Sequence, residues 1–270
     1  MNFLEKIIYF FQGEMTIPTV FGWFHLMCLA ITFIIIFLFY KFKNKYNEKQ
    51  LKKVLAVYGI VALILELLKQ ITWSFNYDNI LNLVRWDYPF YIFPFQLCTT
   101  PIYVSLICLF LKDNKLRKSL FSYISFVTIL GSIATMIMPD SCFVETTLVN
   151  IHTMRLHCGS FVLSIYLLMN EVKPTINNFK NSIIVFLIFT IIANFLNIVF
   201  YNSGLLNGEE FNMFYISPYF VSTLPVFDII QKSVPYIIYL IIYLCVIVSV
   251  SIIIYNLAIL IKSIFKRNKR

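Results

Sequence analysis

Seven long apolar runs constrain this sequence more than any other feature. Each is close to the roughly 20 residues that a helix needs to cross the hydrocarbon core of a bilayer. Strands of a membrane barrel would instead alternate polar and apolar residues over segments of about 10 residues. The pattern therefore predicts an all-α, polytopic membrane helix bundle with about seven transmembrane helices. These cover residues 19–40, 54–75, 90–111, 120–138, 153–169, 182–201 and 234–261.

The composition excludes other classes of protein. Hydrophobic residues make up 60% of the chain and charged residues only 13%, whereas a soluble domain has about 45–50% and 25%. A soluble particle of this size could not bury so much apolar surface. The six cysteines show neither a CxxC motif nor the Cys/His spacing of a zinc site. We therefore expect no metal and no cofactor, and membrane lipid or an acyl chain as the partner.

Charge distribution predicts the orientation in the membrane. Most of the 22 lysines and arginines fall in the loops 41–53, 112–119 and 170–181 and in the C-terminal tail. With seven spans these segments share one face, and the positive-inside rule makes that face cytoplasmic. The N-terminus is then outside, the C-terminus is cytoplasmic, and the protein is a multi-pass protein of the cell membrane. The net charge of +9 is thus explained by topology, and no nucleic acid is expected as a partner.

Three parts of the chain are expected. Residues 1–18 form an outer interfacial segment, in which residues 3–11 place their apolar side chains on one face of a short helix. Residues 19–262 form a single bundle domain, and residues 263–270 form a basic cytoplasmic tail. The apolar segment 202–233 is predicted to dip into the outer leaflet or to cap the bundle.

Polar residues within the spans are the functional candidates, because polar groups are costly inside a membrane. The predicted topology puts them in the outer parts of five spans, which indicates a site open to the outer leaflet. Glu66 and Lys69 are three residues apart on one helix face, where they can pair. The candidates are His25, Glu66, Lys69, Gln96, Cys98, His157, Asn194 and Asn197.

Two candidates form the minimum of a nucleophilic site. Cys98 is predicted about 12 Å deep and His157 about 6 Å deep, so a thiol and an imidazole can meet within the error of the boundaries. Pro101 lacks the N–H that would bond the carbonyl of Leu97, which predicts a kink just below Cys98. His152 is expected in a solvated loop before the fifth span.

Short motifs carry a resemblance to a known family. The segment Phe93-Pro-Phe-Gln-Leu-Cys98 and the segment Met154-Arg-Leu-His157-Cys-Gly159 each begin a predicted span. With looser matches near Asn194 and after Val234, they resemble the YwaF-type bacterial integral membrane proteins over about residues 16 to 260. That family looks related to an animal group of multi-pass lipid acyltransferases. The resemblance implies acyl transfer to, or hydrolysis of, a lipid, with Cys98 carrying the acyl group and His157 assisting.

Three functions are compatible with these observations. The first is a cysteine-dependent lipid acyltransferase or lipid hydrolase, in which Gln96 and Asn194 donate to the oxyanion and Glu66 and Lys69 hold the geometry of the site. The second is a small-molecule or ion transporter, in which the ionisable side chains form the path. The third is a non-catalytic membrane partner that binds lipid. We take the first as the working hypothesis.

Overall fold

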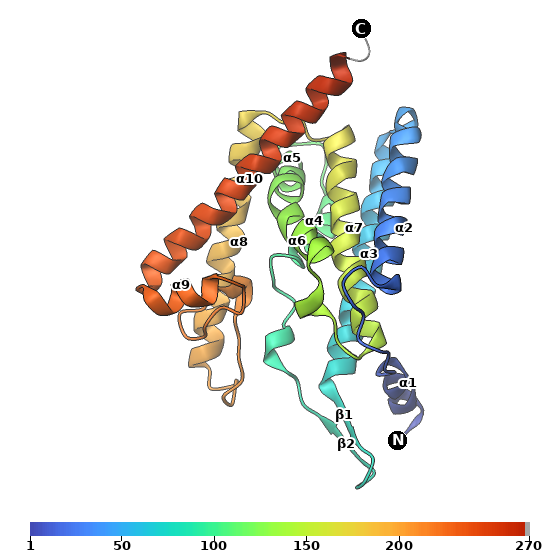
Figure 1. Cartoon of the computed structure of the whole chain (residues 1–270), viewed down its shortest axis with the longest axis vertical. Coiled ribbons are helices and arrows are strands. Elements are labelled where there is room, and N and C mark those ends of the chain that lie inside the picture. Colours follow the sequence, from blue (N-terminus) through green and yellow to red (C-terminus); the bar gives the residue numbers. More distant parts are fainter. Residues whose placement is uncertain (268–270) are drawn as a thin grey trace.

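The computed structural model describes residues 1–267, so residues 268–270 of the predicted tail lie outside the described part of the chain. Helices dominate the described residues (Figure 1). The helices are α1 (Phe3–Phe11), α2 (Trp23–Lys41), α3 (Glu48–Ser74), α4 (Thr100–Phe110), α5 (Lys115–Tyr123), α6 (Ile129–Ile137), α7 (Thr147–Asn170), α8 (Ile176–Asn202), α9 (Phe227–Ser233) and α10 (Tyr236–Arg267). A hairpin of β1 (Phe75–Asp78) and β2 (Leu83–Trp86) follows α3. The membrane helix bundle is thus confirmed, as is the short N-terminal helix.

Five helical segments within residues 1–267 are long and apolar enough to cross a membrane: α2, α3, Lys115–Ile137, α8 and Tyr236–Ile264. Asparagine or threonine side chains cap the first turns of three of them. Asn47 accepts from the amide of Gln50 before α3, and Asn114 and Thr175 do the same for α5 and α8. The more polar α7 has 24 residues and α4 has 11. The count of seven therefore stays a prediction.

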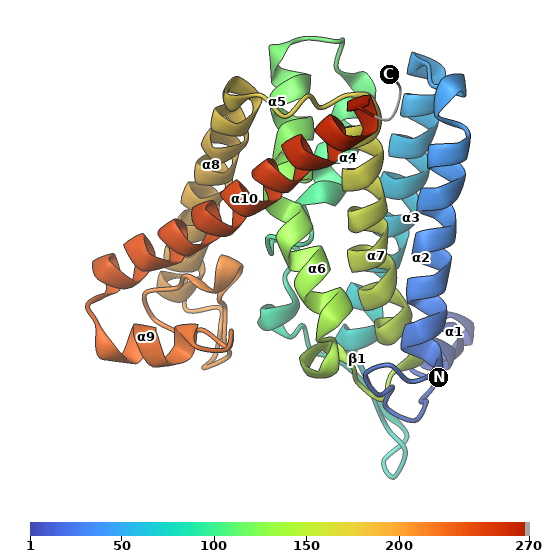
Figure 2. The same cartoon turned by 45° about the horizontal axis from the view of Figure 1, so that its top comes forward.

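The segment Lys115–Ile137 lies at the centre of the bundle. In this segment a π-helical turn at Ile124–Thr128 joins α5 and α6. Of its most apolar stretch of 18 residues, 67% is buried. The peripheral helices α2 and α10 are only 17% buried in the same measure, because their Phe, Ile and Leu side chains face outward. In Figure 2, α10 crosses the bundle obliquely, while α2, α3 and α7 run beside one another.

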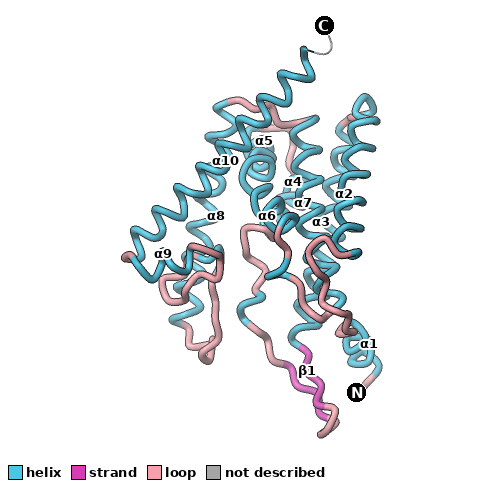
Figure 3. Tube along the Cα trace, viewed as in Figure 1, coloured by secondary structure: helices cyan, strands magenta, loops and turns pink. Residues whose placement is uncertain are grey.

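The two ends of the bundle differ. The N-terminus lies at the end that carries the β1–β2 hairpin, and α10 ends at the opposite end (Figure 3). The loop after α2, the loop before α5 and the loop after α7 also lie at the end where α10 finishes (Figure 2). These are the lysine-rich loops, so one end of the bundle is basic.

The predicted third span, 90–111, differs from the structure. Only Thr100–Phe110 is α-helical, and a short 3-10 turn at Phe90–Ile92 and irregular backbone precede it. Pro101 therefore lies in the first turn of α4, where its missing N–H breaks no helical bond, and the predicted kink is wrong. The carbonyl of Leu97 is not free either, because the Thr100 hydroxyl donates to it at 2.8 Å.

The segment between α8 and α10 packs onto the bundle. Phe211, Met213 and Phe214 are fully buried, and Phe211 stacks on Phe200 of α8 with ring centroids 4.3 Å apart. Backbone in an apolar setting needs internal hydrogen-bond partners. Side chains from other elements supply them, so the segment forms a fixed cap over this part of the bundle.

Candidate functional site

A buried polar cluster joins α3 to α7. We call Glu66, Lys69, Gln70, Tyr88 and His152 the Glu66 cluster. Lys69 Nζ lies 2.7 Å from Glu66 Oε1, and Gln70 Nε2 donates to the same oxygen at 2.6 Å. His152 Nε2 lies 2.7 Å from Glu66 Oε2, and Tyr88 donates to Gln70 Oε1 at 2.7 Å. Both carboxylate oxygens of Glu66 are therefore engaged.

The helical spacing of α3 brings three members of the cluster together. Residues three and four positions apart lie on one face of a helix, so Lys69 and Gln70 reach back to Glu66. The pairing of Glu66 with Lys69 expected from this spacing is confirmed. Glu66 is only 2% exposed, which makes an unpaired charge there very costly. The cluster satisfies that charge with an ammonium, an imidazole and an amide.

His152 was expected in a solvated loop, and this expectation is wrong. The helix α7 begins at Thr147, earlier than the predicted span at 153, and so includes His152. The side chain is 5% exposed and faces Glu66 on α3. Sequence reasoning missed it because the polar residues before 153 end the apolar run. One feature of the sequence could have predicted the contact: Glu66 is the one carboxylate in the predicted spans, and a buried carboxylate needs a partner.

Cys98 lies beside the Glu66 cluster. It belongs to the irregular turn before α4 and packs against the buried side chains of Ala62, Ile102 and Leu156. The thiol interacts electrostatically with Glu66 and Lys69. The thiol therefore packs against apolar side chains and lies within electrostatic range of a buried ion pair.

His157 faces a different helix from His152. Its Nε2 lies 3.4 Å from the Thr135 hydroxyl of α6, and its Nδ1 is buried without a hydrogen-bond partner. The two histidines are five positions apart, so their side chains point about 140° apart around α7. Within the described part of the chain, no hydrogen bond joins the Cys98 thiol to either histidine.

His25 is fully buried between α2 and α6. Its Nδ1 accepts from the amide of Phe21, and its Nε2 lies 3.0 Å from the carbonyl oxygen of Met136. The imidazole therefore ties the start of α2 to the end of α6. Neither nitrogen is directed at the Glu66 cluster.

Three predicted amides bond the C-terminal part of the chain. Gln96 and Asn197 bond the cap, and Asn194 bonds the start of α10. Gln96 donates to the carbonyl of Asn212 at 2.9 Å and accepts from the amide of Phe214 at 2.7 Å. Asn197 makes the same two kinds of bond with the backbone of Met213. Asn194 accepts from Tyr236, at the start of α10. Of the two amides expected as oxyanion donors, Gln96 therefore holds the backbone of the cap, and Asn194 is bonded to the Tyr236 hydroxyl of α10.

The family of the chain follows from comparison with known proteins. A family model described as TMEM164 family matches residues 20–255, which covers α2 to α9, most of α10, the turn with Cys98 and the Glu66 cluster. The chain belongs to the TMEM164 family, a multi-pass membrane family. Neither the curated proteins nor the solved structures give a match. Among residues 1–267, no group of three or more His, Cys, Asp or Glu side chains is placed to hold a metal ion.

Proposed function

We propose that this TMEM164-family protein is a cysteine-dependent enzyme of the cell membrane that transfers or hydrolyses the acyl group of a lipid. Cys98 is the nucleophile in this proposal. The observation that carries it is a buried Glu66–Lys69 pair close enough for its charges to act on the Cys98 thiol. The resemblance to the YwaF-type proteins and to animal lipid acyltransferases supports the same chemistry.

The reaction needs a base, and α7 offers two histidines. Glu66 holds the ring of His152 at 2.7 Å, as the carboxylate of a catalytic triad holds its histidine. His157, which the sequence favours, is the alternative base, and its Nδ1 has no partner. Catalytic hydrogen bonds are often long in a ligand-free enzyme and shorten when substrate binds. For this reason both histidines stay candidates for the proton transfer.

The proposed chemistry has two steps. The base takes the proton of the Cys98 thiol, the thiolate attacks the acyl carbonyl, and the protonated base returns the proton to the departing lipid oxygen. A second lipid hydroxyl or water then attacks the thioester and releases the thiol. Lys69 supplies positive charge that favours the thiolate and the oxyanion. Glu66 positions Lys69 and His152.

The test combines covalent labelling with turnover. Purified protein in lipid nanodiscs is treated with an acyl-thiol-reactive lipid probe, the adduct is mapped, and acyl exchange is measured with the Cys98→Ser and His152→Ala variants. We expect labelling at Cys98 and a loss of turnover of about 10² or more for the loss of the base. Cys108→Ser is the matched control, because Cys108 lies on α4 and is 1% exposed.

Two results would contradict the proposal. Full acyl exchange by Cys98→Ser would exclude the nucleophile. Equal losses for the Cys98 and Cys108 variants would assign both effects to packing. Combining Cys98→Ser with His152→Ala or with His157→Ala then identifies the base, because a nucleophile and its base act as a unit and their losses do not add. Ion or solute flux into proteoliposomes without labelling would favour a transporter instead.

A further inference from the structure

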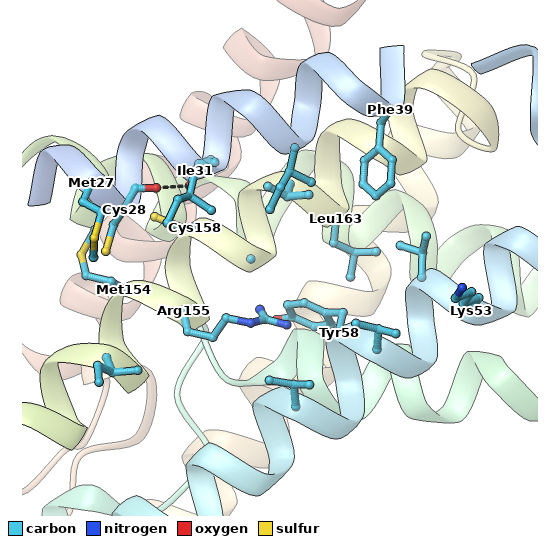
Figure 4. A pocket seen from close by; sticks show the side chains of 18 of the residues that line it. Met27, Cys28, Ile31, Phe39, Lys53, Tyr58, Met154, Arg155, Cys158 and Leu163 are labelled. Carbon is cyan, nitrogen blue, oxygen red and sulfur yellow. Dashed lines mark hydrogen bonds between the residues drawn. The ribbon is translucent and has the colours of Figure 1, made fainter. Parts of the chain in front are cut away.

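A groove between α2, α3 and α7 has no part in the proposed chemistry. Its volume is about 690 Å³, within the range of pockets that bind small molecules (Figure 4). Most of the lining side chains are apolar. They include Met27, Ile31 and Phe39 of α2, Val54 and Val57 of α3, and Val162 of α7.

Two cations line this groove, and Arg155 is the one that lies against a buried ring. Arg155 of α7 lies with its guanidinium carbon 5.3 Å from the centre of the Tyr58 ring. Figure 4 shows the two side chains next to each other. Its Nη1 is buried and has no hydrogen-bond partner. Among the described residues, no carboxylate forms an ion pair with it. Ionisable groups within membrane spans usually have a charged partner, so a guanidinium whose described contact is an aromatic ring has room for an anion.

The neighbouring residues are shaped around this guanidinium. Gly159 lies one turn after Arg155, and a Cβ at that position would overlap Nη1. The Tyr58 hydroxyl lies 2.6 Å from the Ser160 hydroxyl, which fixes the ring that the guanidinium covers. The arginine is thus held across the face of α7 and does not turn outward to a lipid headgroup.

We propose that this groove binds a long-chain fatty acid, with its carboxylate on Arg155 and its chain along the apolar wall. A guanidinium pairs with a carboxylate through two parallel hydrogen bonds. From Met27 to Phe39 the wall of α2 is about 18 Å long at 1.5 Å per residue. This length is close to one leaflet of a hydrocarbon core about 30 Å thick. A guanidinium without a carboxylate partner beside an apolar channel suits a single chain with a single anionic group.

The site is separate from the proposed chemistry. Arg155, Tyr58 and Gly159 do not belong to the Glu66 cluster, and fatty-acid binding does not require the Cys98 thiol. Failure of the acyl-transfer proposal would leave this inference standing. The reverse also holds, since turnover at Cys98 does not show what Arg155 binds.

Equilibrium binding of labelled palmitate to the full chain in non-ionic detergent tests the inference. We expect saturable binding, which Arg155→Gln weakens by about 10-fold or more through the loss of a charge-assisted contact. Gly159→Ala is expected to weaken it too, because the new Cβ displaces Nη1. Lys53→Gln is the matched control, since Lys53 lines the same groove and is expected to leave binding unchanged.

Competitors and stability separate ligand binding from packing. Hexadecanol has the same chain without the charge and is expected not to compete, and lysophosphatidic acid tests a phosphate in place of the carboxylate. Without ligand, Arg155→Gln is expected to unfold at a temperature no lower than the wild type, because it removes an unpaired charge. Equal competition by hexadecanol, preference for lysophosphatidic acid, or wild-type binding by Arg155→Gln would overturn the inference. If Arg155→Gln does not fold, Gly159→Ala decides in the same way.

Discussion

The ion pair between Glu66 and Lys69 offers the sharpest test of the site. Replacing Glu66 by Gln keeps the shape of the side chain but removes its charge, and it leaves Lys69 buried at 9% exposure without its carboxylate. Breaking a buried pair on one side costs about 3–5 kcal/mol. We expect a loss in the free energy of unfolding of about 3 kcal/mol, the low end of that range. The reason is that a lysine can turn its ammonium toward water.

The opposite replacement is expected to cost less. In Lys69→Met, the carboxylate of Glu66 still has His152 at 2.7 Å and Gln70 at 2.6 Å. The expected loss is about 1.5–3 kcal/mol, typical of one hydrogen bond to a charged group. The double variant leaves neither charge of the pair, so its loss should be smaller than the sum of the single losses by about 1.5 kcal/mol or more.

Reversible unfolding in mixed detergent micelles measures all four proteins of this double-mutant cycle. The pair of Lys118 and Asp113, at 3.2 Å and more than half exposed on both sides, is the control. Its coupling is expected to stay within about 0.2–1 kcal/mol, as for other surface pairs. Losses for Glu66 and Lys69 that add to within about 0.5 kcal/mol would refute the coupling and the role of the cluster as a unit.

Three further predictions follow from the structure. Gln96→Ala is expected to destabilise the cap by about 1–3 kcal/mol, because it leaves the Phe214 amide and the Asn212 carbonyl without this side-chain partner. Hydrogen exchange of the amides of residues 211–216 measures this loss of stability. Asp78 accepts hydrogen bonds from the amides of Leu81 and Ile80, and these bonds lower the pKa of its carboxyl. The amides of this turn should therefore stay protected from exchange above the usual pKa of an aspartate and lose protection only as the pH falls through the lowered pKa, which amide hydrogen exchange measures. In a cysteine-free background, an impermeant thiol reagent applied to whole cells should label Glu14→Cys and not Asn44→Cys, and the reverse pattern would contradict the predicted orientation.

Sequence alone predicted the features that depend on neighbours along the chain. Long runs of Phe, Ile and Leu cannot be hidden from water in a particle of this size, so they determine a membrane helix bundle. The pairing of Glu66 with Lys69 depends only on the 3.6-residue period of one helix, and the structure confirms it. The short helix Phe3–Phe11 followed from its apolar face in the same way.

Only the tertiary structure decided which helices present their polar groups to one another. Because α7 begins at Thr147 and not at 153, His152 is part of the helix and contacts Glu66. Each residue turns a helix by about 100°, so His157 lies on another face of α7 and contacts Thr135. The amide of Gln96 similarly found its backbone partners more than 100 residues away, in a cap whose conformation no local pattern encodes. Side chains at one depth in a membrane can belong to different faces, because hydropathy determines depth and packing determines rotation.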